Sequence, residues 1–447
     1  MEMVHLHIGI DDTDSPSKGC TTYVASLLVE KLSKLDTRFT DYPNLVRLNP
    51  NIPWKTRGNG ALCLRIECDR GAIEDVKEAV VDTVEENSDF DYIGTDPGIV
   101  FLPKRTVPQE VRNFAKEAIQ SIVKLDASVK LVKQFGGEAV GYKSGRGVIG
   151  ALAAVGETLE GDHTYELIAY RFPKNRGTKR LIDAHSVGIM DEKTAPLTFN
   201  NIDQETNRVL ITPRGPDPVF LGIRGENPVV VKGAFDLLQG GEPIERWVIF
   251  RTNQGTDAHL RRFSRLACIR PFNNVIVKGT VINEPKIVPR RHVIFSIRDD
   301  TAIIDCAAYE PTGDLRKVAR QLMIGDKIEV FGAVRPPSKT HALTINLEKI
   351  RIMKLVPKIL FHNPKCPKCD KTLSSMGKAQ GYRCEKCGYK SKELTKIQTI
   401  QERALENRLY VTALHSQRHL TKPLSRYGGE KRFAKSRFVM IRGWHST

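Results

Sequence analysis

The chain has 447 residues, of which 40% are hydrophobic and 27% charged, and its net charge is +17. This length and composition are typical of two to four globular domains. No run of about 18 uncharged apolar residues occurs, which excludes a membrane-spanning helix, and no basic segment followed by an apolar stretch opens the chain as a signal peptide would.

The positive charge is concentrated near the end of the sequence. Residues 357–447 contain 20 Lys and Arg but 6 Asp and Glu, a net charge of +14, so that only +3 falls on the first 356 residues. A basic segment on a nearly neutral body predicts a polyanionic partner, most often a nucleic acid, although a solubilising tail has a similar composition. Five of the nine cysteines are scattered, which indicates a reducing cytoplasm rather than a disulfide framework.

The first elements predicted are a strand, an acidic loop and a helix. Apolar residues alternate over 4–10 and recur at helical spacing over 24–35. Asp11, Asp12 and Asp14 stand between them, and Thr21 lies where the helix begins. Clustered carboxylates suit Mg²⁺, and a helix N-terminus attracts phosphate. The pattern therefore indicates a phosphate and magnesium site, with an acidic turn and a threonine helix cap as the alternative.

A basic, glycine-rich loop follows at Lys55-Thr-Arg-Gly-Asn-Gly60. Gly58, Asn59 and Gly60 allow a ligand to approach the backbone closely, and Lys55 and Arg57 can neutralise phosphate. The loop is not a Walker A motif, and a plain hairpin loop remains the alternative. Strands and helices alternate through residues 1–140, which predicts an α/β or α+β domain.

Residues 141–265 form a second predicted region, with a small-residue helix near Gly150 and a strand over 165–170. Asp217 lies between two prolines, which hold its carboxylate on a stiff backbone. The polar stretch 251–259 follows an apolar strand, and polar side chains clustered at a strand end often form a site. An exposed polar loop is the alternative reading of that stretch.

Residues 270–355 show three strands, a short helix over 315–322 and two further strands, the order expected of an OB-fold barrel that grips single-stranded nucleic acid; another small barrel is the alternative. Two cysteine pairs follow, Cys366 with Cys369 and Cys384 with Cys387. Their spacing predicts a four-cysteine zinc ribbon in which the closed coordination sphere makes the metal structural rather than catalytic.

The last region, 396–447, is predicted to begin with a helix over 397–410 and to continue as a basic, aromatic tail. Cations and aromatic rings together suit phosphate contact and base stacking, and a solvated tail is the alternative. The candidate RNA-binding residues are Arg418, His419, Lys422 and Arg426, followed by Tyr427, Lys431, Arg432, Phe433, Lys435, Arg437, Phe438 and Trp444.

Over essentially its whole length the chain resembles the archaeal tRNA(Ile) 2-agmatinylcytidine synthetases. The resemblance depends on the order of several motifs: Ile10-Asp-Asp-Thr-Asp14 with Gly19-Cys-Thr-Thr22, Gly150-Ala-Leu-Ala-Ala154, Gly215-Pro-Asp-Pro218 with Gly222-Ile-Arg-Gly225, Arg251-Thr-Asn-Gln-Gly-Thr-Asp257, the barrel, the ribbon and Arg418-His-Leu-Thr-Lys-Pro423. It implies a multidomain α+β protein with a kinase-like α/β domain (1–140), a ferredoxin-like domain (141–265), an OB-fold (270–355), a zinc ribbon (357–395) and a basic tRNA-binding region (396–447).

The resemblance also implies an activity. Such an enzyme uses ATP to phosphorylate the C2 oxygen of the wobble cytidine in the tRNA(Ile) with a CAU anticodon, which must read AUA, and agmatine then displaces the phosphate. Thr21 becomes the candidate phosphoacceptor, and Asp11, Asp12 and Asp14 handle Mg²⁺ and phosphate, with Asp12 the first choice of ligand and Asp14 a possible base. ATP is assigned to Lys55, Arg57, Gly58, Asn59 and Gly60, and agmatine to Asp217, Glu166 and Asp257.

Two other functions fit parts of the sequence. An OB-fold with a zinc ribbon also describes a single-stranded nucleic-acid-binding protein without catalysis, in which the first half would be a scaffold. A different ATP-dependent RNA-modifying enzyme could use the same framework with another amine.

Overall fold

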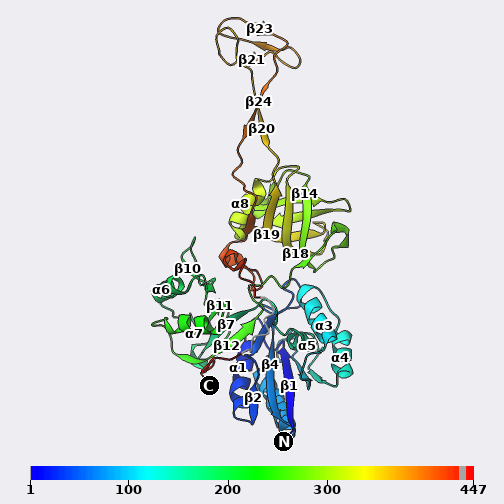
Figure 1. Ribbon diagram of the computed structural model, residues 1–447, viewed down its shortest axis with the longest axis vertical. Helices are drawn as coiled ribbons and strands as arrows, with labels where there is room; N and C mark the ends of the chain where they lie inside the picture. Colours follow the sequence, from blue (N-terminus) through cyan, green and yellow to red (C-terminus); the bar gives the residue numbers. More distant parts are fainter. Residues whose placement is uncertain (1, 432–438, 447) are drawn as a thin grey trace.

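A ten-stranded sheet runs through the first two predicted domains without a break in the computed structural model, which describes residues 2–431 and 439–446 (Figure 1). The two halves of the sheet meet where Arg251 and Thr252 pair in parallel with Asn44 and Leu45. The strand order is β6 (Glu138–Gly141), β5 (Gly98–Leu102), β1 (Met3–Asp11), β4 (Gly60–Asp69), β3 (Asn44–Arg47), β12 (Ile244–Thr252), β7 (Thr164–Arg171), β11 (Val219–Gly225) and β8 (Thr198–Phe199), with β2 (Thr37–Phe39) paired to β4.

Helices cover the sheet because each has one apolar face to bury. In the first half, α1 (Thr21–Ser33) and α2 (Ile73–Asn87) share a core with one face, and α3 (Gln109–Gln120), α4 (Leu125–Gln134) and α5 (Gly147–Gly156) share a core with the other. In the second half, α6 (Ala184–Thr194) packs on α7 (Pro228–Asp236), which lies on β7 and β11. The hairpin β9 (Ile202–Asp203) and β10 (Arg208–Val209) extends beyond them. None of the helices within the described residues is long and apolar enough to cross a membrane.

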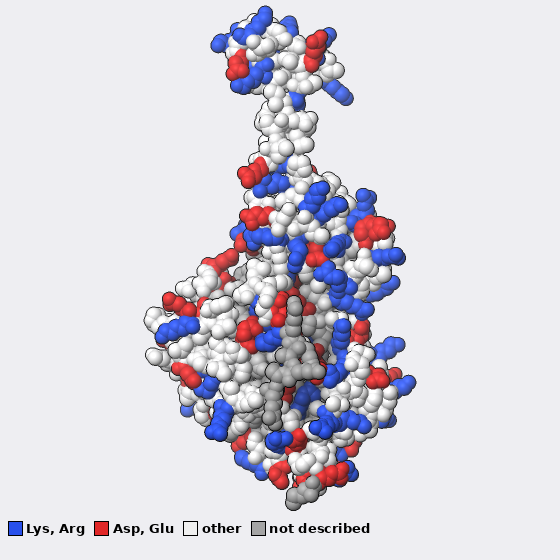
Figure 2. Space-filling view, viewed as in Figure 1, with Lys and Arg blue, Asp and Glu red and all other residues white. Residues whose placement is uncertain are grey.

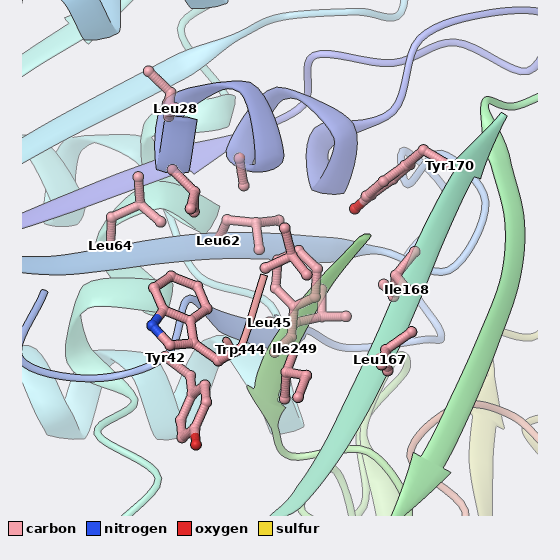
Figure 3. Close-up of a cluster of buried hydrophobic side chains, with 14 of the residues drawn as sticks. Leu28, Tyr42, Leu45, Leu62, Leu64, Leu167, Ile168, Tyr170, Ile249 and Trp444 are labelled. Atoms are coloured by element: carbon pink, nitrogen blue, oxygen red, sulfur yellow. The ribbon is translucent and has the colours of Figure 1, made fainter. Parts of the chain in front are cut away.

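The core contains Trp444, one of the residues predicted to bind RNA. Trp444 is 9% exposed, and its ring centroid lies 5.9 Å from that of Tyr42. Figure 3 shows both side chains in the buried cluster beneath α1, near Leu62 of β4. The predicted stacking of Trp444 on bases is therefore wrong, because its ring is already buried against the sheet. The candidates Arg432, Phe433, Lys435, Arg437 and Phe438 lie outside the described residues.

The small-residue helix predicted near Gly150 is confirmed as α5, and it lies unusually close to the sheet. A Cβ atom at Gly9 of β1 would stand 2.1 Å from the carbonyl oxygen of Ala151. Only a glycine permits this separation. The close contact brings α5 against the end of β1, where the acidic cluster begins.

Residues 274–354 form the closed barrel that the sequence predicted. It consists of β14 (Asn274–Val281), β16 (His292–Arg298), β17 (Ile303–Ala308), α8 (Asp314–Arg320), β18 (Lys327–Arg335) and β19 (Thr344–Lys354). The pairing of β14 with β16 closes the sheet, and short strands add to its edges: β13 (Arg261–Arg262), β15 (Lys286–Val288) and β25 (Leu409–Val411). The helix lies between the third and fourth barrel strands, as in an OB-fold.

The zinc ribbon stands at the far end of a two-stranded arm (Figure 1). The arm pairs β20 (Lys358–His362) with β24 (Ile397–Gln401), and the tip contains β21 (Ser374–Ser375), β22 (Tyr382–Arg383) and β23 (Lys390–Ser391). The sulfur atoms of Cys366, Cys369, Cys384 and Cys387 lie within 4.8 Å of one another, which fits tetrahedral zinc with bonds of about 2.3 Å. Figure 2 shows Lys and Arg side chains over this tip and the barrel.

The helix predicted over 397–410 is wrong. Residues 397–401 form β24 and residues 409–411 form β25. The physical reason is tertiary: the chain must pass back from the ribbon to the barrel, and on the way residues 397–401 pair their backbone with β20. The spacing of apolar residues did not show that the backbone of residues 397–401 would pair with another strand.

After β25 the chain returns to the body of the molecule, where it meets a buried ammonium. Lys349 of β19 is fully buried, and its Nζ atom donates to both carboxylate oxygens of Asp257, at 2.8 and 2.6 Å. It also donates to the carbonyl oxygen of Lys422 and the hydroxyl of Tyr427, each at 2.9 Å. The ammonium of Lys349 thus joins the barrel, the loop after β12 and residues 412–427, the returning segment.

Replacing Lys349 with Met should loosen this junction. Removing one partner of a buried ion pair costs about 3–5 kcal/mol because the other charge stays buried without compensation. We expect a lower thermal unfolding midpoint and faster backbone hydrogen exchange over residues 412–427. Lys354→Met, at an exposed position of the same strand, is the matched control. Equal midpoints for the two variants would contradict the role of Lys349.

Removing zinc should unfold the ribbon alone, since within the described residues its three strands pair only with one another. Cys384→Ser should reduce the bound zinc and raise hydrogen exchange over 363–405, while exchange in the sheet and barrel stays unchanged. The control is Cys268→Ser, at an exposed cysteine outside the cluster. Exchange that rises throughout the barrel would show that the metal supports more than the ribbon.

Candidate active site

A cavity of about 920 Å³ is lined by residues from both halves of the sheet and from the returning C-terminal segment. Its wall includes the end of β1, the start of α1, the loop 47–60 and parts of β7 and β11. Most predicted site residues lie in it: Asp11, Asp12, Asp14, Thr21, Lys55, Arg57, Gly58, Asn59, Gly60, Glu166, Asp217, Arg418 and His419.

Three carboxylates gather at one end of the cavity. Asp11 is the last residue of β1, and a Cβ at Gly150 of α5 would lie 1.8 Å from its Oδ2 atom, so the helix backbone closes over this side chain. Burial, with repulsion from Asp12, raises the pKa of Asp11, and burial raises the pKa of Asp12 to about 6. Burial also raises the pKa of Asp14, against the opposing charge of Arg57. Such a cluster is stabilised in its ionised form by a bound cation.

The basic loop is tied to this acidic end. Thr56 donates its hydroxyl hydrogen to Asp14 Oδ1 at 3.0 Å, and Arg57 Nε lies 3.6 Å from Asp14 Oδ2. Arg57 Nη1 also donates to the carbonyl oxygen of Gly19 at 3.0 Å. Thr21 is buried at the first turn of α1, where its Oγ1 accepts a hydrogen bond from Thr13 at 3.1 Å. The basic loop therefore contacts Asp14, and the candidate phosphoacceptor Thr21 lies beside Thr13, which stands between Asp12 and Asp14 in the chain.

Asp217 lines the same cavity, and one of its carboxylate oxygens accepts no hydrogen bond within the described residues. Its Oδ1 atom accepts hydrogen bonds from Arg180 at 3.2 Å and from the backbone N–H of Val219 at 3.1 Å. Its Oδ2 atom lies 3.9 Å from Arg57 Nη1, beyond hydrogen-bonding distance. Burial raises the pKa of Asp217, although Arg57 and Arg180 oppose this. A cationic ligand at Oδ2 would favour the ionised carboxylate.

Glu166 belongs to a polar network with the returning segment. Its Oε1 atom accepts from Arg224 Nε at 3.0 Å, and its other oxygen accepts from Gln254. Arg224 Nη2 lies 2.8 Å from His419 Nδ1, and Gln254 Oε1 lies 2.9 Å from the same atom. Burial, together with Arg47 and Arg224, lowers the pKa of His419 well below its usual value. His419 therefore lies in the wall as a neutral ring, rather than as the RNA-binding cation that the sequence suggested.

Three other predicted site residues lie outside the cavity lining. Asp257 neutralises Lys349 and accepts from the backbone N–H of Lys422 at 2.7 Å. Lys422 itself is 7% exposed and pairs with Asp162 at 3.3 Å and Glu430 at 3.0 Å. These groups already have partners inside the protein, so the structure does not bring Asp257 to an agmatine site or Lys422 to an RNA surface.

Arg426 is likewise buried and not exposed on an RNA-binding surface. It is 2% exposed, its Nη2 atom lies 2.8 Å from Asp162 Oδ1, and it pairs with Glu226 as well. Because two carboxylates neutralise its charge, Arg426 fastens the returning segment to the second half of the sheet. The prediction that it contacts RNA is corrected.

Sequence reasoning gave no site role to several residues of the cavity wall, among them the charged or aromatic side chains of Arg47, Trp54, Arg146 and Arg224. Trp54 is 51% exposed beside the basic loop, and an aromatic residue next to Lys and Arg is a pattern typical of base stacking. Arg146 pairs with Asp96 at 2.9 Å. Arg224 stands in a motif that the resemblance had singled out, but Arg47 simply ends an apolar strand and carried no signal of its own.

Sequence models of known domains match most of the chain. The TiaS TCKD domain matches residues 7–144, the TiaS FLD domain 145–259, an OB-fold nucleic acid binding domain 275–353, and the TiaS C-terminal zinc ribbon domain 363–405. The tRNA(Ile) 2-agmatinylcytidine synthetase TiaS of Methanocaldococcus jannaschii is 43% identical over 94% of this chain and 99% of its own. That of Pyrococcus horikoshii is 43% identical over 96% and 99%.

Solved structures agree with these relatives. A crystal structure of TiaS in complex with its isoleucine tRNA and ATP is similar with a TM-score of 0.86 and 37% identity, over 96% of this chain and all of the other. A complex of TiaS with the same tRNA, AMPCPP and agmatine gives a TM-score of 0.84 and 35% identity over the same shares. By its four matched domains and its identity to these proteins over nearly its whole length, the chain belongs to the tRNA(Ile) 2-agmatinylcytidine synthetase family.

Proposed function

We propose that this protein uses ATP to attach agmatine to C2 of the wobble cytidine of the tRNA(Ile) whose anticodon is CAU. The observation that carries the proposal is that one cavity contains both a carboxylate cluster beside a basic, glycine-rich loop and a separate carboxylate, Asp217, with an oxygen that accepts no hydrogen bond within the described residues. Phosphoryl transfer needs the first, and an amine that carries a guanidinium needs the second. A single-stranded nucleic-acid-binding protein without catalysis has no use for this combination.

The first step activates the cytosine. Its C2 oxygen is a poor leaving group, so phosphorylation of this oxygen makes its later displacement feasible. Asp12 is the proposed first ligand of Mg²⁺, with Asp11 and Asp14 beside it, because hard cations prefer carboxylate oxygens and substrate phosphates. The metal would neutralise phosphate charge, while the loop 55–60 positions ATP. Thr21, at the same end of the cavity, is the proposed phosphoacceptor on the protein.

The second step binds agmatine across the cavity. Its guanidinium can donate to Asp217 Oδ2, whose partner oxygen is fixed by Arg180 and Val219. Glu166 lies on the same wall, where Arg224 and Gln254 hold its carboxylate, and it sets the shape and charge of the site. We leave Asp257 out of the agmatine site because it serves Lys349.

The parts of the chain divide the work. We assign residues 1–140 to ATP, 141–265 to agmatine, and the OB-fold, the ribbon and Arg418 at the cavity wall to tRNA. The target base must leave its stack to enter the cavity, and the exposed ring of Trp54 is suited to receive it. The scattered free cysteines support a reducing, cytoplasmic location.

Asp12→Asn should abolish the ATP-dependent chemistry but leave tRNA binding intact. Loss of a metal ligand removes several kcal/mol of transition-state stabilisation, so we expect a fall of about 100-fold or more in agmatine incorporation. The product is measured by mass spectrometry of the tRNA, and binding by filter retention. Asp126→Asn, at an exposed acid of α4, is the control. Turnover close to wild type would remove Asp12 from the metal site.

Asp217→Asn should raise the KM for agmatine about 10- to 100-fold, because a hydrogen bond to a charged group is worth about 1.5–3 kcal/mol. The KM for ATP should stay the same. Asp236→Asn, an exposed change in the same half of the sheet, serves as control. If KM for agmatine does not move, the guanidinium binds elsewhere; if wild-type protein gives no agmatine-modified tRNA at all, the proposed function itself fails.

A further inference from the structure

Among the residues that the structure describes, one guanidinium of the cavity wall, that of Arg47, has no hydrogen-bond or ion-pair partner. Arg47 ends β3 and lines the cavity. The described residues offer its guanidinium no hydrogen bond and no ion pair, and its Nε atom is buried. A buried cationic donor without an acceptor is costly, and natural structures rarely keep one without a use.

The other arginines of the described cavity wall each face a carboxylate. Arg57 lies near Asp14 and Asp217, and Arg146 lies near Asp96. Arg224 pairs with Glu166 at 3.0 Å, and Arg418 lies 3.6 Å from Glu348. Arg47 therefore differs from its neighbours in that its charge remains available to a ligand.

Arg47 is also held rigidly at its backbone. Its N–H donates to Asn253 Oδ1 at 2.8 Å, and its carbonyl oxygen accepts from Asn253 Nδ2 at 3.0 Å. Asn253 is 2% exposed, so this double contact is shielded from water. The side chain is confined as well, because a Cβ at Gly58 would lie 2.7 Å from Arg47 Nη1. A group fixed in this way is preorganised for a charge that arrives in the cavity.

Arg47 lies close to carboxylates from both halves of the sheet. Burial lowers the pKa of its guanidinium, Arg224 lowers it further, and Glu166 and Asp14 act in the opposite direction. Arg47 thus lies within electrostatic range of Asp14 in the acidic cluster and of Glu166 on β7.

We propose that Arg47 is a catalytic residue that binds the phosphoryl group carried on the C2 oxygen of the cytidine, through both steps of the reaction. This inference rests on the proposed function. In the first step a phosphorus–oxygen bond to the nucleotide breaks, its electron pair stays on the nucleotide oxygen, and a new bond forms to the C2 oxygen. In the second step the agmatine nitrogen bonds to C2, the C2–O bond breaks, its electron pair leaves with the phosphate, and the nitrogen loses a proton to solvent.

A guanidinium suits this task on chemical grounds. Its planar donors bind phosphate oxygens in a bidentate manner, and its charge stabilises both the transferring phosphoryl group and the departing phosphate. Stabilisation that acts in the transition state lowers kcat when it is lost, whereas binding of ATP in the ground state would appear in KM. Contact with a tRNA backbone phosphate would appear instead in the tRNA affinity and its salt dependence.

The test compares Arg47→Ala with Arg38→Ala, a surface change at an exposed arginine of β2. Arg38→Ala should behave as wild type. Arg47→Ala should lower kcat for agmatine incorporation about 100- to 1,000-fold, the range seen when one transition-state donor is removed. The KM for ATP, the affinity for tRNA and the thermal unfolding midpoint should remain close to wild type. Added guanidinium ion should restore part of the lost activity, because it can occupy the space of the missing side chain.

Each other outcome overturns the inference. An unchanged kcat, a rise confined to the KM for ATP, or a loss confined to tRNA affinity would give Arg47 a different role. If Arg47→Ala does not fold, Arg47→Lys keeps the charge and much of the packing but loses the planar fork, and it should still lower kcat at least tenfold; wild-type kcat in this variant would reject the proposal. Because wild-type turnover is measured in parallel, failure of the proposed function is recognised separately.

Discussion

The loop that follows β12 fixes the relation between three distant parts of the chain, because Asn253, Gln254 and Asp257 each pair with a group in another segment. Asn253 holds the backbone of Arg47, Gln254 connects Glu166 with His419, and Asp257 neutralises Lys349. Buried polar groups are tolerated only when they are satisfied, so none of these contacts can be lost cheaply. The cavity keeps its shape because this loop is held by β3, by Glu166 of β7 and by Lys349 of the barrel.

The same constraint keeps charged groups of both signs together in one cavity. Carboxylates gather at the end of β1, where α5 closes over them, and Asp217 faces them from the other half of the sheet. Arg57 lies near both Asp14 and Asp217, and its positive charge offsets the repulsion between these acids. Ligands that bring opposite charge then replace or complement these contacts. Arg47 is the exception within the described wall, and its free charge is what points to an anionic intermediate.

The segment that follows the ribbon connects the barrel to the cavity wall. The barrel and the arm carry the ribbon away from the body, and the chain then returns to place Arg418 and His419 in the cavity wall (Figure 1). Lys349 holds this return in place from within the barrel. Lys349 therefore joins the barrel to the segment that carries Arg418 and His419 through contacts that are shielded from water.

The sequence by itself determined the features that depend on local spacing. Alternating apolar residues and clustered aspartates predicted the first strand and the acidic site, the cysteine pairs predicted the ribbon, and the order of strands predicted the barrel. These signals are local because the side chains that act together are neighbours in the chain, or repeat at the period of one element.

Only the tertiary structure decided which charges are available to ligands. Lys422 and Arg426 look like RNA-binding cations in the sequence, but both are neutralised by Asp162, which lies far away in the chain. Asp257 looked like a ligand for agmatine and instead neutralises Lys349. Arg47 carried no signal at all, since an arginine at the end of a strand is usually solvated or paired. Whether a charge has a partner depends on which distant segments the fold brings beside it, and no local pattern records that.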